Sequence, residues 1–444
     1  MSATRKALAA LALALVLALL AACRGLGPVG DLLRPKTPWE EYRDSLQEAK
    51  LEETRAGRAW IAAGERAVAE APAVALPYRE VVHFDPLRPT AGAWRLALER
   101  GQELRIDVGG AASGERGLFV DLLRSDGEEW EPIAALDEGA QLRHRVGDSG
   151  SYVLRVQPEL LAGGRWSVTV EVGASLAFPV EGKTSRAIGG RFGDPRNGGS
   201  RPHEGVDIFA ARGTGALAAA DGRASRVGSN RLGGKTVWLR TDDGLGLYYA
   251  HLDRQLVRTG ERVAAGELIG RVGNTGNAAH TSPHLHFSVH ENGPLDPWPF
   301  VHEPTERPAE VTSDLALLGG WARVAGSRVN LRAAPSAAAA LRGDARRHEA
   351  LRVEGASAAW YRVVGARGPA YVASWLVEGV ETPVRRLALV APEPLLHEPA
   401  PDAPIVAQAA AGTSLEVLAE RQGHWLVRRA PGDRPAWVSR GGAQ

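Results

Sequence analysis

The spacing of apolar residues changes several times along this chain of 444 residues. From Trp39 to Ala49 apolar side chains recur every three or four positions, which is the spacing of one face of an α-helix, and helical composition continues to about residue 70. Thr37, with Glu40 three positions later, forms the sequence signature of a helix start. We therefore expect a helical segment at 37–72, preceded by a tether at 23–36. Its apolar stripe either packs on the chain itself, which is the commoner case, or binds a partner.

From about residue 77 to residue 174 apolar and polar residues alternate, as they do in strands with one buried face. Turn-forming clusters such as 147–150 separate the alternating stretches. The alternating apolar positions are Leu104, Ile106, Val108, Leu118, Val120, Leu122, Tyr152, Leu154, Val156, Trp166, Val168, Val170 and Val172. Several short strands in one stretch predict a β-sandwich, and we assign residues 77–174 to an accessory domain of this kind.

The chain beyond residue 304 is strand-like again and contains an internal repeat. Leu331 precedes Trp360 by 29 residues, and Leu396 precedes Trp425 by the same interval. In each copy a second aromatic residue, followed by valine, comes 11 or 12 residues after the tryptophan. The repeat predicts two small β units that are built alike.

These two copies resemble bacterial SH3-like domains, the first at 318–380 and, less closely, the second at 386–440. The resemblance implies small barrels, which often hold cell-wall peptides in grooves lined by aromatic side chains. We expect Trp360 and Trp425 to be core residues. Trp375, next to the end of a predicted strand, is the better candidate for binding.

Composition narrows the classes of protein to consider. Charged residues make up 24% of the chain and hydrophobic residues 44%, which is usual for globular domains and excludes wholesale disorder. The formal net charge is +1. Because nucleic acid is held mainly by basic surfaces, this chain is predicted not to bind it.

The single cysteine, Cys23, closes a short uncharged run that follows two basic residues. Such a run is typical of an export signal and is too short to span a bilayer comfortably. Leu-Ala-Ala-Cys at 20–23 resembles a bacterial lipobox. The resemblance implies a signal peptide at 1–22 and a lipidated Cys23 that anchors the chain to a membrane, on the periplasmic face of the outer membrane if the host is Gram-negative. The alternative is a plain signal peptide with a chance cysteine.

Histidines are concentrated in one stretch, which begins at His203 and holds seven of the twelve. Asp207 follows His203 by four positions and enters a strand-like segment. His284 and His286 are two positions apart in another strand-like segment, so both imidazoles face the same side of the predicted strand. His251 lies in a third such segment.

These residue types are suited to hydrolysis with zinc. A hydrolytic zinc site takes three protein ligands, for which two imidazoles and a carboxylate serve well, and keeps one position for water. The metal lowers the pKa of that water and polarises a carbonyl group. A histidine that does not bind the metal moves protons or stabilises developing charge. Strand alternation alone does not decide which of His284 and His286 is the ligand.

Taken in order, the motifs resemble those of the lysostaphin/LytM-type zinc metalloendopeptidases of bacterial cell walls. The matching stretches are Arg191-Phe192-Gly193, His203-Glu204-Gly205-Val206-Asp207-Ile208, Gly213-Thr214, Ala220-Asp221-Gly222, Tyr249-Ala250-His251-Leu252, Gly260, Gly266, Ile269-Gly270, Gly273-Asn274-Thr275-Gly276 and Pro283-His284-Leu285-His286-Phe287. The resemblance implies a metallopeptidase domain at 176–303. It also implies an antiparallel sheet of the duplicated-hybrid-motif type with a narrow groove.

The resemblance also implies a role for each candidate residue. His203, Asp207 and His286 match the ligands of Zn²⁺ in that family. His251 and His284 match its two catalytic histidines that do not bind metal. A further acceptor should hold each ligand histidine in the correct tautomer, but the sequence does not name it.

Two more histidines lie close to these motifs. His290 shares strand parity with His284 and His286, so it lies either at the edge of the groove or, as we favour, beyond the site. His280 lies in a loop and either contacts substrate or, more commonly, is a surface residue.

The sequence thus predicts a mainly β, multidomain protein of the cell envelope. Its predicted activity is zinc-dependent hydrolysis of peptide cross-links or stems of peptidoglycan. One alternative is a non-catalytic peptidoglycan-binding protein that activates other wall hydrolases. Another is a zinc peptidase that acts on proteins. All five site positions are filled, which favours the enzyme.

Overall fold

The computed structural model describes residues 34–110, 117–125, 127, 129–136, 140–365 and 368–442. The predicted leader and Cys23 lie outside these residues. The described chain is mainly β with few helices, as predicted. No helix in the described ranges is long and apolar enough to cross a membrane.

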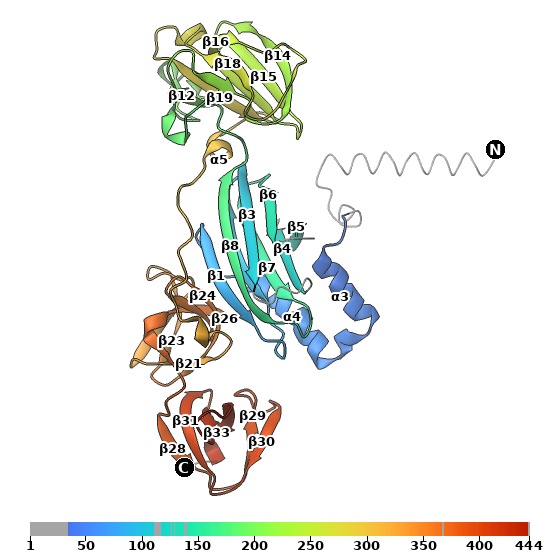
Figure 1. The fold of residues 1–444 in the computed structure, drawn as a ribbon, viewed down its shortest axis with the longest axis vertical. Helices are drawn as coiled ribbons and strands as arrows, with labels where there is room; N and C mark the ends of the chain where they lie inside the picture. The colour runs from blue at the N-terminus through green and yellow to red at the C-terminus, as the bar shows by residue number, and fades with distance from the viewer. Residues whose placement is uncertain are drawn as a thin grey trace, which may run out of the picture.

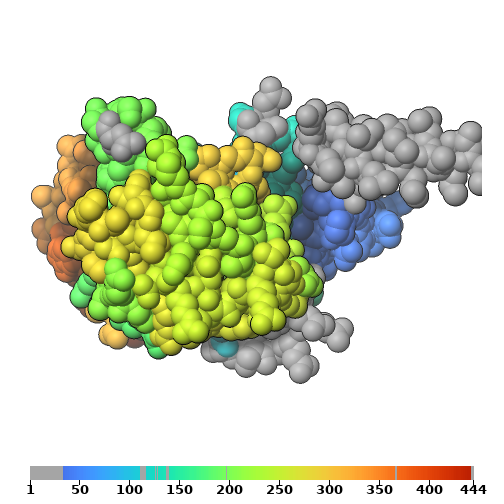
Figure 2. Space-filling view, turned by 90° about the horizontal axis from the view of Figure 1, so that it is seen from above, coloured from blue at the N-terminus to red at the C-terminus, as the bar shows by residue number. Residues whose placement is uncertain are grey.

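Four units, which we name by position, follow one another in an elongated molecule (Figure 1). The histidine-rich unit (176–303, green to yellow) forms one end, and the two-sheet unit (77–174) forms the middle. The first C-terminal unit (318–380) and the second C-terminal unit (386–440) continue to the other end. Figure 2 looks onto the end formed by the histidine-rich unit.

Two helices, rather than one continuous helix, precede the sheets. They are α3 (Pro38–Glu48) and α4 (Arg55–Ala69), joined by the 3-10 turn η1 (Leu51–Glu53). The predicted capping box is present, because the Thr37 hydroxyl accepts from the Glu40 N–H and the Glu40 carboxylate accepts from the Thr37 N–H. The break has a local cause. Lys50 adopts left-handed backbone (φ 56°), and Thr54 caps a new helix by accepting from the Gly57 N–H at 3.0 Å.

The aromatic stripe of these helices packs on the chain itself. Trp39 and Trp60 stack with their ring centroids 5.4 Å apart and share an apolar cluster with Phe119 of the two-sheet unit. Both indole N–H groups are paired, since Trp39 donates to the Gln157 side chain and Trp60 to the Pro158 carbonyl, each at 2.7 Å. The helices therefore extend the core of the two-sheet unit.

Two antiparallel sheets face each other in the two-sheet unit. In the first sheet the order is β1 (Tyr78–Phe84), β8 (Gly164–Ala174), β3 (Gln102–Gly110) and β6 (Gln141–Arg145). In the second it is β2 (Gly92–Leu98), β7 (Gly150–Pro158), β4 (Leu118–Ser125) and β5 (Trp130–Ala135). The alternating residues of both sheets share one core, in which Ile106 and Leu154 are fully buried. Each such side chain contributes about 1.5–3 kcal/mol on burial.

One larger antiparallel sheet organises the histidine-rich unit. Its order is β17 (Arg262–Val263), β14 (Gly222–Asn230), β15 (Gly234–Thr241), β16 (Gly246–Gln255), β19 (His284–His290), β12 (Val206–Phe209) and β9 (Ile188–Gly190). Its margins carry β13 (Gly215–Leu217), β18 (Leu268–Val272) and β20 (Pro294–Leu295). A separate hairpin consists of β10 (Pro195–Arg196) and β11 (Arg201–Pro202). The strands with the predicted site residues, β16, β19 and β12, are neighbours.

The chain enters and leaves the histidine-rich unit at the same place. It enters after β8 and leaves through the short helix α5 (Trp298–Val301), which lies between the two units in Figure 1. The Leu176 N–H donates to the Phe300 carbonyl at 2.9 Å. Arg105 of β3 pairs with Glu303 at 2.7 Å. These contacts hold the incoming and outgoing segments against one end of the two-sheet unit.

The C-terminal units are both built from short antiparallel strands. The first contains β21 (Trp321–Val324), β22 (Arg328–Arg332), β23 (Leu341–Arg346), β24 (Ala350–Ser357), β25 (Trp360–Gly365), β26 (Gly368–Ala373) and β27 (Val377–Gly379). The second contains β28 (Arg385–Ala388), β29 (Glu393–Leu396), β30 (Ile405–Ala409), β31 (Ser414–Arg421), β32 (His424–Arg428) and β33 (Ala436–Ser439). The repeated tryptophans occupy β25 and β32.

The three tryptophans of interest differ in burial. Trp425 belongs to the core of the second C-terminal unit, as expected. The expectation for Trp360 is wrong, because this side chain is half-buried and lines a surface groove beside Trp375. Trp375 is 68% exposed, and its ring centroid lies 6.2 Å from that of Trp360. Trp360 starts β25 next to this groove, so strand position rather than residue type sets its exposure.

A shared sheet joins the two-sheet unit to the first C-terminal unit, although the sequence did not indicate it. β24 pairs antiparallel with β1, with Val81 opposite Ala356. Glu80, which is fully buried, accepts from the Arg362 guanidinium at 2.6 Å across this junction. The Tyr78 hydroxyl lies 3.2 Å from that of Tyr371. Main-chain pairing and a buried ion pair thus make these two units one body.

Candidate functional site

Neighbouring strands of the histidine-rich unit bring the predicted site residues together. β12 and β19 are antiparallel, with Asp207 directly opposite His286. β16 lies along the other side of β19 and places Ala250, next to His251, opposite His286. His203 lies just ahead of β12. All five predicted residues line one cleft.

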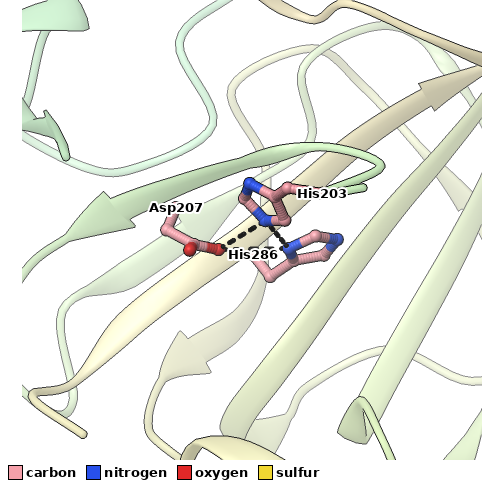
Figure 3. A group of neighbouring side chains, drawn as sticks. All are labelled: His203, Asp207 and His286. Carbon is pink, nitrogen blue, oxygen red and sulfur yellow. Dashed lines mark hydrogen bonds and ion pairs between the residues drawn. The ribbon is translucent and has the colours of Figure 1, made fainter. Parts of the chain in front are cut away.

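Three of the five direct potential ligand atoms toward one point (Figure 3). His203 Nε2 lies 2.9 Å from His286 Nδ1. Asp207 Oδ1 lies 3.1 Å from each of these nitrogens. A tetrahedral zinc ion with ligands at about 2.0–2.1 Å holds its donor atoms about 3.3 Å apart. Only small shifts of the side chains separate the observed triangle from that geometry.

The protonation of Asp207 and His286 also fits a divalent cation. Burial alone would raise the pKa of Asp207, but hydrogen bonds from His203 and His286 outweigh it and hold that pKa well below its usual range. Burial lowers the pKa of His286. Ionised carboxylate and neutral imidazole are the forms that bind metal. Two nitrogens and one oxygen in this arrangement support Zn²⁺ as the cofactor of the site.

Each of the two histidines in this cluster is held from behind by a second polar group. His203 Nδ1 donates to the Arg191 carbonyl at 2.8 Å, which leaves Nε2 as the ligand atom. His286 Nε2 lies 2.9 Å from the Ser288 hydroxyl, which leaves Nδ1. Ser288 shares strand parity with His286, so the alternation pattern already contained this partner.

Arg196 holds the carboxylate of the cluster. Its guanidinium donates to Asp207 Oδ2 at 2.7 Å and lies 2.9 Å from His203 Nδ1. The ion pair leaves Oδ1 for the metal and fixes the plane of the carboxylate. No local sequence signal identifies Arg196, because the β10–β11 hairpin brings it to Asp207.

His251 reaches the cleft from an irregular part of β16. The pairing of β15 with β16 shifts register at this point, and His251 has a φ of 59°. A bulge re-aims a side chain, and left-handed backbone at a non-glycine residue is a strained conformation that clusters at functional sites. Its Nδ1 donates to the Thr275 carbonyl at 2.8 Å, which leaves Nε2 unprotonated. Burial lowers the pKa of His251 to about 4, so the ring is neutral at pH 7.

His284 presents its ring in the same way as His251. Its Nδ1 donates to the Ser282 carbonyl at 2.8 Å. Its Nε2 lies 3.8 Å from Asp207 Oδ1, which is beyond hydrogen-bond distance but next to the cluster. The rings of His284 and His251 have their centroids 5.0 Å apart. Two histidines with acceptor nitrogens thus lie beside the three metal-binding groups.

The cleft around these residues has a volume of about 520 Å³. Trp238 forms part of its wall, with the rings of Tyr248 and His290 centred 4.6 and 5.0 Å away. His290 therefore lies at the edge of the cleft, which is the interpretation that we did not favour from the sequence. His280 is not among the residues that line the cleft.

The comparisons with known proteins concern the same part of the chain. Residues 201–297, which include all five predicted site residues, match the model of peptidase family M23. The peptidoglycan DD-endopeptidase ShyC of Vibrio cholerae is 40% identical over 99 residues, which are 22% of this chain and 22% of that protein. The L-Ala--D-Glu endopeptidase of Bacillus subtilis is 34% identical over 132 residues, 28% of this chain and 40% of that protein.

One similar solved structure is the catalytic domain of lysostaphin from Staphylococcus simulans. It is 36% identical and covers 26% of this chain and 90% of that domain, with a TM-score of 0.24. The chain matches only about a fifth to two fifths of the length of the two curated relatives named above. Residues 201–297 are therefore similar to peptidase family M23, with relatives of the lysostaphin and LytM type.

Proposed function

We propose that this chain is a zinc-dependent endopeptidase that hydrolyses peptide cross-links or stems of peptidoglycan. The observation that carries the proposal is the cluster of His203, Asp207 and His286 beside two histidines with free acceptor nitrogens in one cleft. The M23 match and relatives named as peptidoglycan endopeptidases support the substrate class.

The chain's own residues would act in three ways. His203, Asp207 and His286 would hold Zn²⁺, which when bound lowers the pKa of a water molecule and polarises a carbonyl group. His284 and His251 would accept, donate or share protons through Nε2, because their Nδ1 atoms are already bound to carbonyl groups. These main-chain contacts also fix the orientation of both rings before substrate binds.

The remaining parts of the proposal concern the position of the enzyme and its retention on the wall. Lipidation of Cys23 would anchor the chain in the cell envelope, at the outer membrane in a Gram-negative host. The two-sheet unit would be a β-sandwich spacer, and the C-terminal units SH3-like domains that retain peptidoglycan. The exposed ring of Trp375, between two surface grooves, supports a binding role for the first of them.

Digestion of purified sacculi tests the proposed activity. Zinc-loaded wild-type protein should release peptide fragments that mass spectrometry assigns to one bond type. His284→Ala should keep its zinc and lose about 10²–10⁴-fold in rate, the usual contribution of one acid–base group. The activator hypothesis would replace ours if neither protein released fragments and both stimulated a separate wall amidase equally.

A further inference from the structure

The cleft contains a cation that the proposed chemistry does not use. Arg201, on β11, lines the cleft beside the metal-binding groups. Its Nε atom is buried and has no hydrogen-bond partner among the residues that the structure describes. Glu204 and Asp207, the carboxylates that line the cleft, form no ion pair with it.

The other arginine of this hairpin, Arg196, differs from Arg201 in having an ion-pair partner. Arg196 lies directly opposite Arg201 in the β10–β11 pairing and is bound to Asp207 at 2.7 Å. Arg196 is therefore committed to the metal-binding cluster, whereas Arg201 is not. A buried donor that lacks a partner costs about 1–3 kcal/mol, and a ligand group that paired with it in this cleft would remove that cost.

We propose that Arg201 binds a carboxylate group of the peptide substrate. The inference rests on the proposed function, because it places the substrate in the cleft. Arginine is always charged and presents a planar fork of donors that matches a carboxylate with two hydrogen bonds. Arg201 precedes His203 by two residues, so a carboxylate bound there is held next to the reacting bond.

This assignment narrows the substrate class. Murein stems carry free carboxylates along the peptide, whereas bridges built only of glycine carry none between their ends. A neutral bridge would leave the buried Nε of Arg201 unpaired when it binds. A carboxylate-bearing stem would pair it. The cleft is therefore selective for stem peptides with free carboxylates.

Matched muropeptides test the assignment. One sample consists of soluble cross-linked muropeptides, and the other of the same material with its carboxylates converted to carboxamides. Wild-type protein should hydrolyse the carboxylate form with a kcat/KM about 10–100-fold higher, the range for a hydrogen bond to a charged group. Arg201→Ala should remove this preference, so that its kcat/KM is the same for both samples. Arg201→Lys should retain part of it.

Arg231 supplies the matched control. It is exposed next to the cleft-lining residue Leu232 but does not line the cleft itself. Arg231→Ala removes the same charge and should leave the preference unchanged. Zinc content is measured for every variant, so that damage to the metal site is recognised.

The possible outcomes separate the two proposals. If the wild type hydrolyses neither sample, the proposed function fails. If it hydrolyses both samples equally, the function stands and the carboxylate subsite is wrong. A fall of Arg201→Ala on both samples by the same factor would also overturn the subsite, because Arg201 would then only support the hairpin.

Discussion

Two buried clusters of charged side chains, one around Glu80 and one around Asp207, differ in how their polar atoms are paired. At the junction of β1 and β24, Glu80 accepts from Arg362 at 2.6 Å, from Trp94 at 2.7 Å and from Tyr78 at 2.6 Å. Both of its oxygens are therefore satisfied by the chain. The attraction of Glu80 outweighs burial and raises the pKa of Arg362, which keeps its guanidinium charged.

The cluster in the cleft is different, because its three inner atoms meet at one point that a divalent cation can occupy. His203 Nε2, His286 Nδ1 and Asp207 Oδ1 face one another, and their outer atoms are already bound elsewhere. A divalent cation at the centre would contact all three atoms at once. A buried charged cluster whose donors and acceptors all pair within the chain holds the fold, whereas one whose ligand atoms converge on a single point is suited to bind a metal ion. We call the cluster around Glu80 the closed cluster and the one around Asp207 the open cluster.

The largest effect is expected from a substitution that removes one ligand of the open cluster. Asp207→Ala removes the ionised oxygen that the two histidines share and leaves Arg196 without its partner. We expect the zinc content to fall from about one per chain to near zero and the hydrolysis of sacculi to fall to background, because a hydrolytic site needs all three ligands. Elemental analysis and fragment release measure both. Unchanged zinc in this variant would remove the ligand assignment.

The closed cluster should respond in stability instead of activity. Arg362→Met leaves Glu80 buried without its counter-ion, which costs about 3–5 kcal/mol. Chemical denaturation should show this loss, while kcat/KM for a soluble muropeptide stays within about twofold in the protein that remains folded. Arg328→Met, at an exposed ion pair with Asp344 in the same unit, is the control and should leave the stability almost unchanged. Equal losses in the two variants would contradict the comparison.

The stability of the protein should depend on pH through His251, which lies beside the open cluster. Burial lowers the pKa of His251 to about 4, so between pH 6.5 and pH 4 the unfolded chain binds a proton that the folded chain does not. The folded protein is therefore most stable, as far as this group is concerned, above pH 6.5. As the pH falls to about 4 the free energy of unfolding decreases, by at most about 3 kcal/mol. Denaturation of zinc-free protein at several pH values should show a smaller slope for His251→Gln than for the wild type. Identical slopes would exclude this contribution.

The smallest expected effect lies away from both clusters. Trp375→Ala removes an exposed ring at the surface grooves and should weaken binding to sacculi by about 10-fold, the range for an aromatic contact. Hydrolysis of soluble muropeptides should not change. Leu341→Ala, an exposed apolar change on β23 outside the grooves, should leave sacculus binding intact. If both variants bind alike, Trp375 is not a contact.

A point variant is preferable here to removal of the C-terminal units. Deletion after residue 304 would strip β24 from β1 and leave Glu80 without Arg362. Any loss of binding would then be mixed with unfolding of the two-sheet unit. A point variant such as Trp375→Ala leaves the ion pair of Glu80 and Arg362 intact, so a change in binding can be assigned to the removed side chain.

Local pattern was enough to predict much of this protein. Alternation predicted the strands and placed His284 and His286 on one face, because side chains in a strand repeat every two residues. The capping box at Thr37 was likewise readable, since it depends on residues three positions apart. The resemblance in motif order, rather than alternation, indicated which histidines are the candidate zinc ligands.

Contacts between distant residues were decided only by the tertiary structure. Arg196 reaches Asp207 through a hairpin, His251 is re-aimed by a bulge, and the register of β12 with β19 places Asp207 opposite His286. No residue close to Glu80 in the sequence indicates that its partner is Arg362, which is 282 residues away. Spacing along the chain encodes which face a side chain occupies. Which partner meets it across a sheet depends on register and packing, which form only when the whole chain folds.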